Sequence, residues 1–283
     1  MKKLYYKYRP LYEPGSSPNR KIHPFTQSIF AKAEIYYGAP ADFNDPFDCN
    51  LKIHVRDSTD AEWENYLDDL IAEHPASQAQ LSQVRAGKLW KTNPAIVGDI
   101  GKRQQAIHYI ESSVFCLAKK GNSIPMFSYY SDGHTGIAIE FSFSDQEVPC
   151  GFSWLPSATG GVPYDGKVVF RDVEYPPTFP ELNYHRLRKT DRLVRHLMFT
   201  KSQEWVHEEE FRVFRRKVPK STIAFDRKLL TRVVFGCKSN TADVTLVKSW
   251  LKGWPSDVVF SRAEPAPDRF ELIVNDFDVV KGT

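Results

Sequence analysis

Two carboxylates, Glu208 and Glu210, and one guanidinium, Arg212, alternate with other side chains in the segment WVHEEEFR at 205–212. The overlapping run FRVFRR is rich in Phe and Val, so this part of the chain is predicted to be a strand. Successive side chains of a strand point to opposite faces, so we expect these three side chains on one face. Two carboxylates on one face repel each other unless a cation or a substrate lies between them. The pattern therefore indicates either a reactive site or a solvated strand edge on which Arg212 balances two acids.

Other patterns along the chain predict a mixed fold. Runs rich in aromatic and β-branched residues predict strands at 5–9, 34–37, 113–119, 136–141, 167–175, 208–217, 232–237, 256–263 and 269–277. Apolar residues at helical spacing predict helices at 27–33, 60–74, 78–89, 94–112, 183–201 and 242–251. A capping box from Thr59 to Glu62 starts a helical insertion, 57–112, within a single domain of residues 1–283. We therefore expect an α+β domain with mainly antiparallel sheets.

The composition is that of an ordinary soluble globular protein, with 41% hydrophobic and 26% charged residues. A formal net charge of +3 does not by itself indicate nucleic acid as a partner. A basic cluster at 185–196 is expected to be a solvated helix face, with an anion contact as the alternative. The four cysteines lie far apart without a zinc pattern, so we expect a cytoplasmic protein with reduced thiols and no metal site. We expect neither a signal peptide nor a membrane span.

Five segments occur together in one order: YKYR, IYYGAPADFNDPFDC, PMFSYYSDGHTGIAIEF, WxxExEFR and RVVFGC. On these segments the chain resembles a large bacterial family of uncharacterised function that is recognised by its FNDPFD segment. The resemblance spans roughly residues 4–237. One departure is Phe127, where the family is expected to have Trp; the change keeps an aromatic side chain. The family label itself implies little chemistry.

The order of these parts also resembles the ADP-ribosyltransferase fold. Its members have an Arg or His on a first strand, a polar and aromatic second motif, and an ExE or QxE motif on a later strand. The resemblance implies an NAD-dependent ADP-ribosyltransferase or an NAD glycohydrolase, with NAD as the substrate and an acceptor that the sequence does not reveal. It also implies a role as a bacterial toxin or an antiviral (phage-defence) effector, by analogy of fold alone. The matching residues are Arg9, Ser128, Tyr129, Tyr130, Glu208 and Glu210.

NAD cleavage would give these residues separate tasks. Breaking the bond between nicotinamide and ribose puts positive charge on the sugar, and we expect Glu210 to stabilise that charge and to hold a ribose hydroxyl. Glu208 would orient or deprotonate the acceptor. Arg9 would bind a phosphate, unless it only pairs with a structural acid. Tyr129 or Tyr130 would stack on the cationic ring, and on a strand only one of them would face a given side.

The segment ADFNDPFDCN at 41–50 is predicted to be a rigid loop that shapes a pocket. Phe43 and Phe47 are expected to anchor it in the core. Loops held by a rigid scaffold often carry function, so its polar side chains are also candidates for substrate contact. These side chains are Asn44, Asp45 and Asp48.

A Mg²⁺-dependent nuclease is the main alternative, because a carboxylate cluster can hold this cation. The usual D…ExK pattern of such enzymes would place a Lys after the acids, where this chain has Phe211 and Arg212. A binding module without catalysis is a third hypothesis, since the chain has neither a Walker loop nor a zinc pattern. The acids of the nuclease hypothesis are Asp45, Asp48, Glu208 and Glu210.

The NAD hypothesis depends on one geometric condition. The acids late in the chain must converge with the basic and phenolic side chains from its beginning and middle. They must do so around a cavity that is large enough for a dinucleotide.

Overall fold

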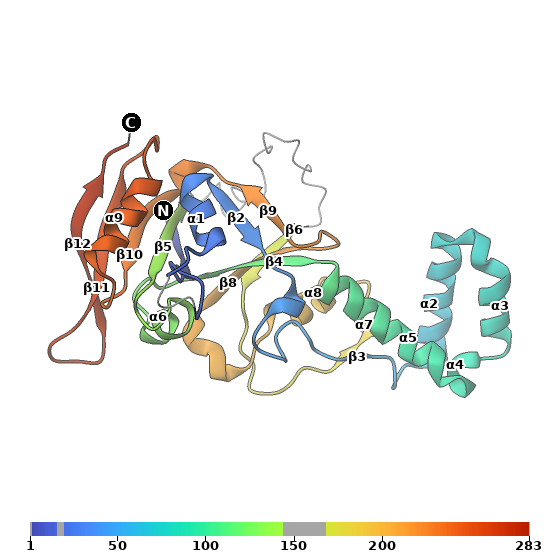
Figure 1. Cartoon of the computed structure of the whole chain (residues 1–283). Helices are drawn as coiled ribbons and strands as arrows, with labels where there is room; N and C mark the ends of the chain where they lie inside the picture. Colours follow the sequence, from blue (N-terminus) through green and yellow to red (C-terminus); the bar gives the residue numbers. More distant parts are fainter. Residues whose placement is uncertain (1, 16–19, 144–167, 283) are drawn as a thin grey trace.

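The computed structural model describes residues 2–15, 20–143 and 168–282, and its largest element is an eight-stranded sheet (Figure 1). The strands of this sheet are β1 Lys3–Arg9, β4 Ser113–Ala118, β5 Ile137–Phe143, β6 Val168–Asp172, β8 Glu210–Arg215, β10 Leu230–Phe235, β11 Val258–Pro265 and β12 Leu272–Val280. They lie in the order β12-β11-β10-β5-β1-β4-β8-β6. Neighbouring strands are antiparallel, except that β10 and β11 are parallel.

Two short strand pairs lie beside this sheet. β2 (Glu34–Tyr37) pairs with β9 (Ser221–Ala224) in antiparallel orientation, and β3 (Ile53–His54) pairs with β7 (Leu182–Asn183) in parallel orientation. The expected class, a mixture of helices with a mostly antiparallel large sheet, is confirmed.

Helices cover both faces of the large sheet. They are α1 Pro24–Ala31, α6 Ile124–Tyr130 and α9 Thr241–Trp250. On one face, Phe30 of α1 and Val247 of α9 join the largest buried apolar cluster. On the other face, Phe127 of α6 packs edge-on against Tyr8 of β1, with ring centroids 5.0 Å apart. Burial of both faces explains why β4 and β5 are almost continuously apolar.

The sheet has an opening between β1 and β4. β1 pairs with β5 along its whole length, but in the described residues it pairs with β4 only where Tyr6 lies opposite Ala118. Further along β4, the backbone of Val114 instead bonds with Gly38, which follows β2. The two central strands therefore separate next to β8, and polar side chains can enter the sheet there.

Residues 60–110 form a helical arm at the end of the molecule opposite β12 (Figure 1). Its helices are α2 Asp60–Glu73, α3 Gln78–Ala86, α4 Leu89–Thr92 and α5 Pro94–Gln105, followed by a π-helix at Ala106–Ile110. The predicted capping box starts α2, where Thr59 Oγ1 accepts from the Glu62 amide at 3.2 Å and Glu62 Oε2 accepts from the Thr59 amide at 2.7 Å. Trp63 and Trp90 stack inside the arm's own apolar cluster.

The basic cluster at 185–196 holds this arm in place. The single helix expected at 183–201 is two helices, α7 (Tyr184–Leu187) and α8 (Arg192–Phe199). Cations of this cluster pair with acids of α2, so the expectation of a merely solvated face is wrong for these residues. The ion pairs are Arg186–Glu62, Arg188–Asp69 and Lys189–Asp69.

His185 makes the docking of this arm sensitive to acid. Its ring packs against Trp63 and Tyr66, with centroids 4.4 and 4.9 Å apart, and neither ring nitrogen has a partner in the described residues. Burial, with the charge of Arg188, lowers the pKa of His185 from 6.5 to about 4. Between pH 6.5 and about pH 4, the His185 ring binds a proton in the unfolded chain but stays neutral in the folded chain. Stability is therefore complete above pH 6.5 and falls, by up to roughly 3 kcal/mol, as the pH drops to about 4.

We expect His185→Leu to reduce this loss of stability on acidification. Urea unfolding followed by tryptophan fluorescence, near neutral pH and at about pH 4.5, measures it. His74→Leu, which alters an exposed histidine at the end of α2, should keep the wild-type pH dependence. His108 is also buried with a lowered pKa and keeps its own contribution in both variants. Equal pH dependence of the two variants would contradict the assignment to His185.

Candidate functional site

Arg212 of β8 is completely buried and binds two acids at once. Its Nε and Nη2 donate to the two carboxylate oxygens of Glu210 at 2.9 and 2.7 Å. Its Nη1 and Nη2 donate to the two oxygens of Asp48, both at 2.7 Å. Burial disfavours the cation, but the charges of Asp48 and Glu210 outweigh it and raise the pKa of Arg212. The guanidinium thus ties the loop at 41–50 to β8 of the large sheet.

Lys201 is a second buried cation among the same acids. Its Nζ lies 2.6 Å from Glu208 Oε2, 3.3 Å from Asp48 Oδ2 and 3.9 Å from Glu210 Oε2. Burial opposes its charge, but the three carboxylates outweigh burial and hold the pKa of Lys201 above its usual range. The two cations therefore satisfy the condition under which closely spaced carboxylates are tolerated.

Glu208 and Glu210 converge through a turn and not through strand alternation. The strand expected from residue 208 begins at Glu210, and Glu208 ends a 3₁₀ helix, Gln203–Glu208. Between them Glu209 has a φ of +41°, a left-handed conformation that costs a residue other than Gly about 1–2 kcal/mol. β8 also lies between β4 and β6, so the interpretation as a solvated strand edge is wrong.

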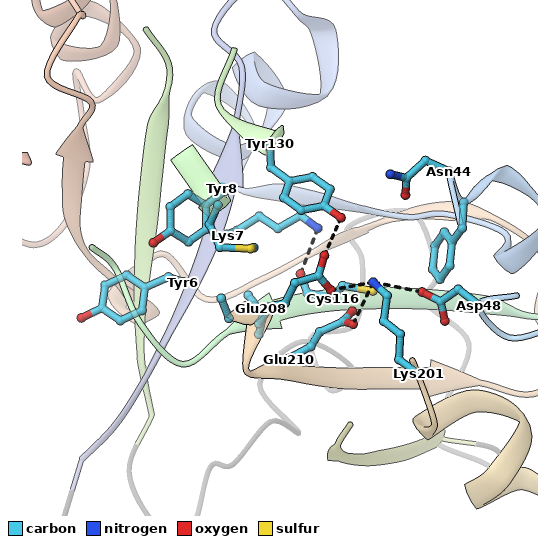
Figure 2. A pocket seen from close by; sticks show the side chains of 14 residues that line it. Tyr6, Lys7, Tyr8, Asn44, Asp48, Cys116, Tyr130, Lys201, Glu208 and Glu210 are labelled. Carbon is cyan, nitrogen blue, oxygen red and sulfur yellow. Dashed lines mark hydrogen bonds and ion pairs between the residues drawn. The ribbon is translucent and has the colours of Figure 1, made fainter. Parts of the chain in front are cut away.

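These acids line a pocket in the opening between β1 and β4 (Figure 2). Side chains from β1, β4, α6, β8 and the loop at 41–50 form its walls. Its cavity volume is about 150 Å³, a size that in other proteins holds one benzene ring. The pocket therefore admits a ring-sized group, and the expectation of a cavity for a whole dinucleotide is wrong.

Four of the predicted site residues line the pocket: Glu208, Glu210, Tyr130 and Asn44. Tyr130 Oη donates to Glu208 Oε1 at 2.6 Å, and Figure 2 shows this contact beside Lys201. Asn44 is exposed, so it lies at the mouth. Asp48, proposed as a substrate contact or a nuclease acid, also lines the pocket. Burial and the charge of Glu210 raise the pKa of Glu208, although Lys201 and Tyr130 act in the opposite direction.

Arg9 does not join this group. Its Nε donates to Thr26 Oγ1 at 3.2 Å and its Nη2 lies 3.2 Å from His23 Nδ1, at the start of α1. Burial lowers the pKa of Arg9 to about 10. In the described residues Arg9 pairs with neither a pocket acid nor a structural Asp. The expectation of a structural acid as its partner is therefore wrong, and Arg9 does not converge with Glu208 and Glu210.

Ser128 and Tyr129 also lie outside the pocket, because residues 124–130 form a helix and not a strand. Successive helical side chains point about 100° apart, so Tyr130 faces the pocket while its neighbour faces outward. Tyr129 is 66% exposed and packs against Trp205 on the surface. Ser128 is exposed as well.

Asp45 has the scaffold role expected in the loop at 41–50, whereas Phe47 departs from its predicted role. Asp45 is buried but does not line the pocket; its Oδ1 accepts from the Phe47 amide at 2.9 Å, which rigidifies the loop. Phe47 is 63% exposed and anchors nothing in the core. Phe43 is half-buried, contacts the second apolar cluster and lines the pocket as expected of a scaffold residue.

The sequence analysis did not identify two cations of the pocket, Lys7 and Lys201. Lys7 lies two residues before Arg9 on β1, so the alternation of basic residues in YKYR carries a signal for it. Lys201 follows α8 without any pattern that distinguishes it from other lysines. Its role depends on contacts with residues 48, 208 and 210, which only folding brings near.

Comparison of the chain with protein-family models, with curated proteins and with solved structures found no match. Among the described residues, no group of three or more His, Cys, Asp or Glu side chains is arranged to hold a metal ion. Within the same part of the chain, no helix has both the length and the apolar character needed to cross a membrane.

We expect Arg212→Met to lower the free energy of unfolding by about 3–5 kcal/mol, because Asp48 and Glu210 would stay buried without their shared cation. Arg216→Met is the matched control, since Arg216 is exposed just beyond β8 and should change stability by less than about 0.5 kcal/mol. Urea unfolding of the three proteins measures both effects. Similar losses in the two variants would show that the buried guanidinium is not a structural centre.

Proposed function

We propose that the protein cleaves NAD, as an ADP-ribosyltransferase-like enzyme or an NAD glycohydrolase, and that the nicotinamide ring enters the pocket. One observation carries the proposal: Glu208 and Glu210 share a ring-sized pocket with the aromatic side chain of Tyr130, which contacts Glu208 (Figure 2). The departing group of NAD is a ring of this size, and its cationic form favours aromatic faces. The charge that develops on the ribose favours a nearby carboxylate.

The contacts of the two acids suggest a division of work. Both oxygens of Glu210 are held by Arg212, which fixes the orientation of a carboxylate that would stabilise the positive sugar. Burial and the charge of Glu210 raise the pKa of Glu208, which makes its carboxylate a stronger base, so it would deprotonate the acceptor. Tyr130 and Lys201 would position Glu208 through their hydrogen bonds of 2.6 Å each.

The remainder of the dinucleotide would lie outside the cavity. Asn44 at the mouth is placed to contact the ribose next to the scissile bond. Arg9 is no longer proposed as a phosphate ligand, because its donors are directed to Thr26 and His23. The resemblance of the order of parts to the ADP-ribosyltransferase fold supports a toxin or phage-defence role for such an activity.

A Mg²⁺-dependent nuclease is the second candidate, because Asp48, Glu208 and Glu210 line one pocket. The contacts of these acids favour the first candidate. Lys201 and Arg212 already lie between the carboxylates, within 2.6–2.9 Å of an oxygen, and a cation there would compete with both.

Nicotinamide release from NAD by the purified protein tests the proposal. We expect Glu210→Gln to lower the rate roughly hundredfold or more, since it removes the charge that meets the sugar cation. Glu208→Gln should lower it by about 10²–10⁴-fold, as loss of a general base does. Glu209→Gln is the control and should retain the wild-type rate, because Glu209 pairs with Lys120 outside the pocket.

Thermal melts of each variant separate lost chemistry from lost folding. A wild-type protein that is inert with NAD, alone and with protein or nucleic-acid acceptors, rejects the proposal. Cleavage of nucleic acid that requires Mg²⁺ would establish the nuclease instead. If the protein is inactive in both assays, a binding module without catalysis is the remaining hypothesis.

A further inference from the structure

Lys7 is a pocket residue to which neither proposed function assigns a task. It lies in the middle of β1, and its side chain is half-buried and lines the pocket. Figure 2 shows its amine directed into the space between β1 and Tyr130. The contacts of this amine determine which ligand group it can bind.

The amine of Lys7 has unused hydrogen-bonding capacity. A protonated lysine has three donors, and in the described residues one of them has a hydrogen-bond acceptor, the carbonyl oxygen of Cys116 at 2.9 Å. Its other close contact is the face of the Phe115 ring, with Nζ 5.0 Å from the centroid. Burial lowers the pKa of Lys7, and the charge of Arg9 adds to this effect.

The other polar groups deep in the pocket are already engaged. Tyr130 Oη donates to Glu208, and Lys201 Nζ lies among three carboxylates. Tyr6 Oη donates to Glu140 Oε2 and Tyr8 Oη donates to the Lys120 carbonyl, both at 2.8 Å, so the hydroxyl protons of these two residues are already used. A ligand that carries an acceptor oxygen would therefore find free donors at Lys7.

We propose that Lys7 selects the ligand of the pocket by donating hydrogen bonds to an exocyclic carbonyl oxygen on a six-membered aromatic ring. The cavity of about 150 Å³ and the aromatic side chain of Tyr130 suit the ring, and the ammonium of Lys7, which Figure 2 shows near Tyr130, suits its oxygen. A carboxamide is favoured over a carboxylate, because the acids beside Lys7 would repel a negative charge. The inference rests on the proposed function because nicotinamide is such a ring. It concerns binding alone, so its test does not require NAD cleavage.

Binding of three small compounds to the full-length protein, by calorimetry or NMR titration, tests the inference. Nicotinamide and benzamide both carry the carboxamide, whereas 3-methylpyridine has a ring of the same size without the oxygen. We expect the wild-type protein to bind both amides roughly tenfold or more tightly than 3-methylpyridine, because the amine would donate to them alone. In Lys7→Met, which keeps the length of the side chain, this preference should disappear.

Lys3→Met is the matched control, since Lys3 lies exposed on the same strand and should leave the preference unchanged. If Lys7 only satisfies the Cys116 carbonyl where the sheet opens, Lys7→Met will lower the melting temperature but keep the ligand preference, and the inference is overturned. The wild-type comparison decides by itself if Lys7→Met does not fold: equal affinity for the three compounds, or no binding of any, refutes it. Amide preference without NAD cleavage would reject the proposed function while the inference stands.

Discussion

The buried guanidinium of Arg212 is the interaction on which the site depends. A cation without any exposure is costly unless its donors are satisfied, and here two carboxylates, Asp48 and Glu210, accept from it in a planar, two-sided arrangement. One of these acids comes from the loop at 41–50 and the other from β8. The same contacts therefore close the loop over the sheet and fix the direction of a pocket carboxylate. Lys201 extends the network to Glu208, so the acids are positioned before any ligand arrives.

The pocket exists because the sheet is interrupted beside this network. β1 leaves β4 after one pairing position, and the Lys7 amine takes over a backbone carbonyl that a continuous ladder would have bonded. Three acids and three bases then face one another in a small space: Asp48, Glu208 and Glu210 with Lys7, Lys201 and Arg212. Their balance suits a ligand with little net charge of its own, and the phenol ring of Tyr130 suits a flat one.

Much of the fold was predictable because it depends on local patterns. The strands that became β4, β5, β10 and β11, and the helices α2 and α9, follow from period-two and helical spacing, and the Thr59 capping box marks the start of α2 correctly. The errors in the predicted secondary structure also arise from local features of the chain. Residues 124–130 form a helix that was not predicted; Ser123 caps it and Phe127 packs on Tyr8. Glu209 turns the chain where the alternation of acids suggested a continuous strand.

By itself the sequence determined the class of the fold and singled out Glu208, Glu210, Tyr130 and Asn44 as residues of one pocket, since residue type and spacing report which side chains are chemically unusual. Only the tertiary structure decided that Arg9 belongs to the α1 contact, that Lys7 and Lys201 line the pocket, and that the cavity has a volume of about 150 Å³. The physical reason is that the role of a Lys or Arg side chain depends on which carboxylate or carbonyl oxygen lies nearest to it in the folded chain. Those partners lie on strands and loops that are far apart in the sequence, and local sequence patterns do not show which of them meet in space.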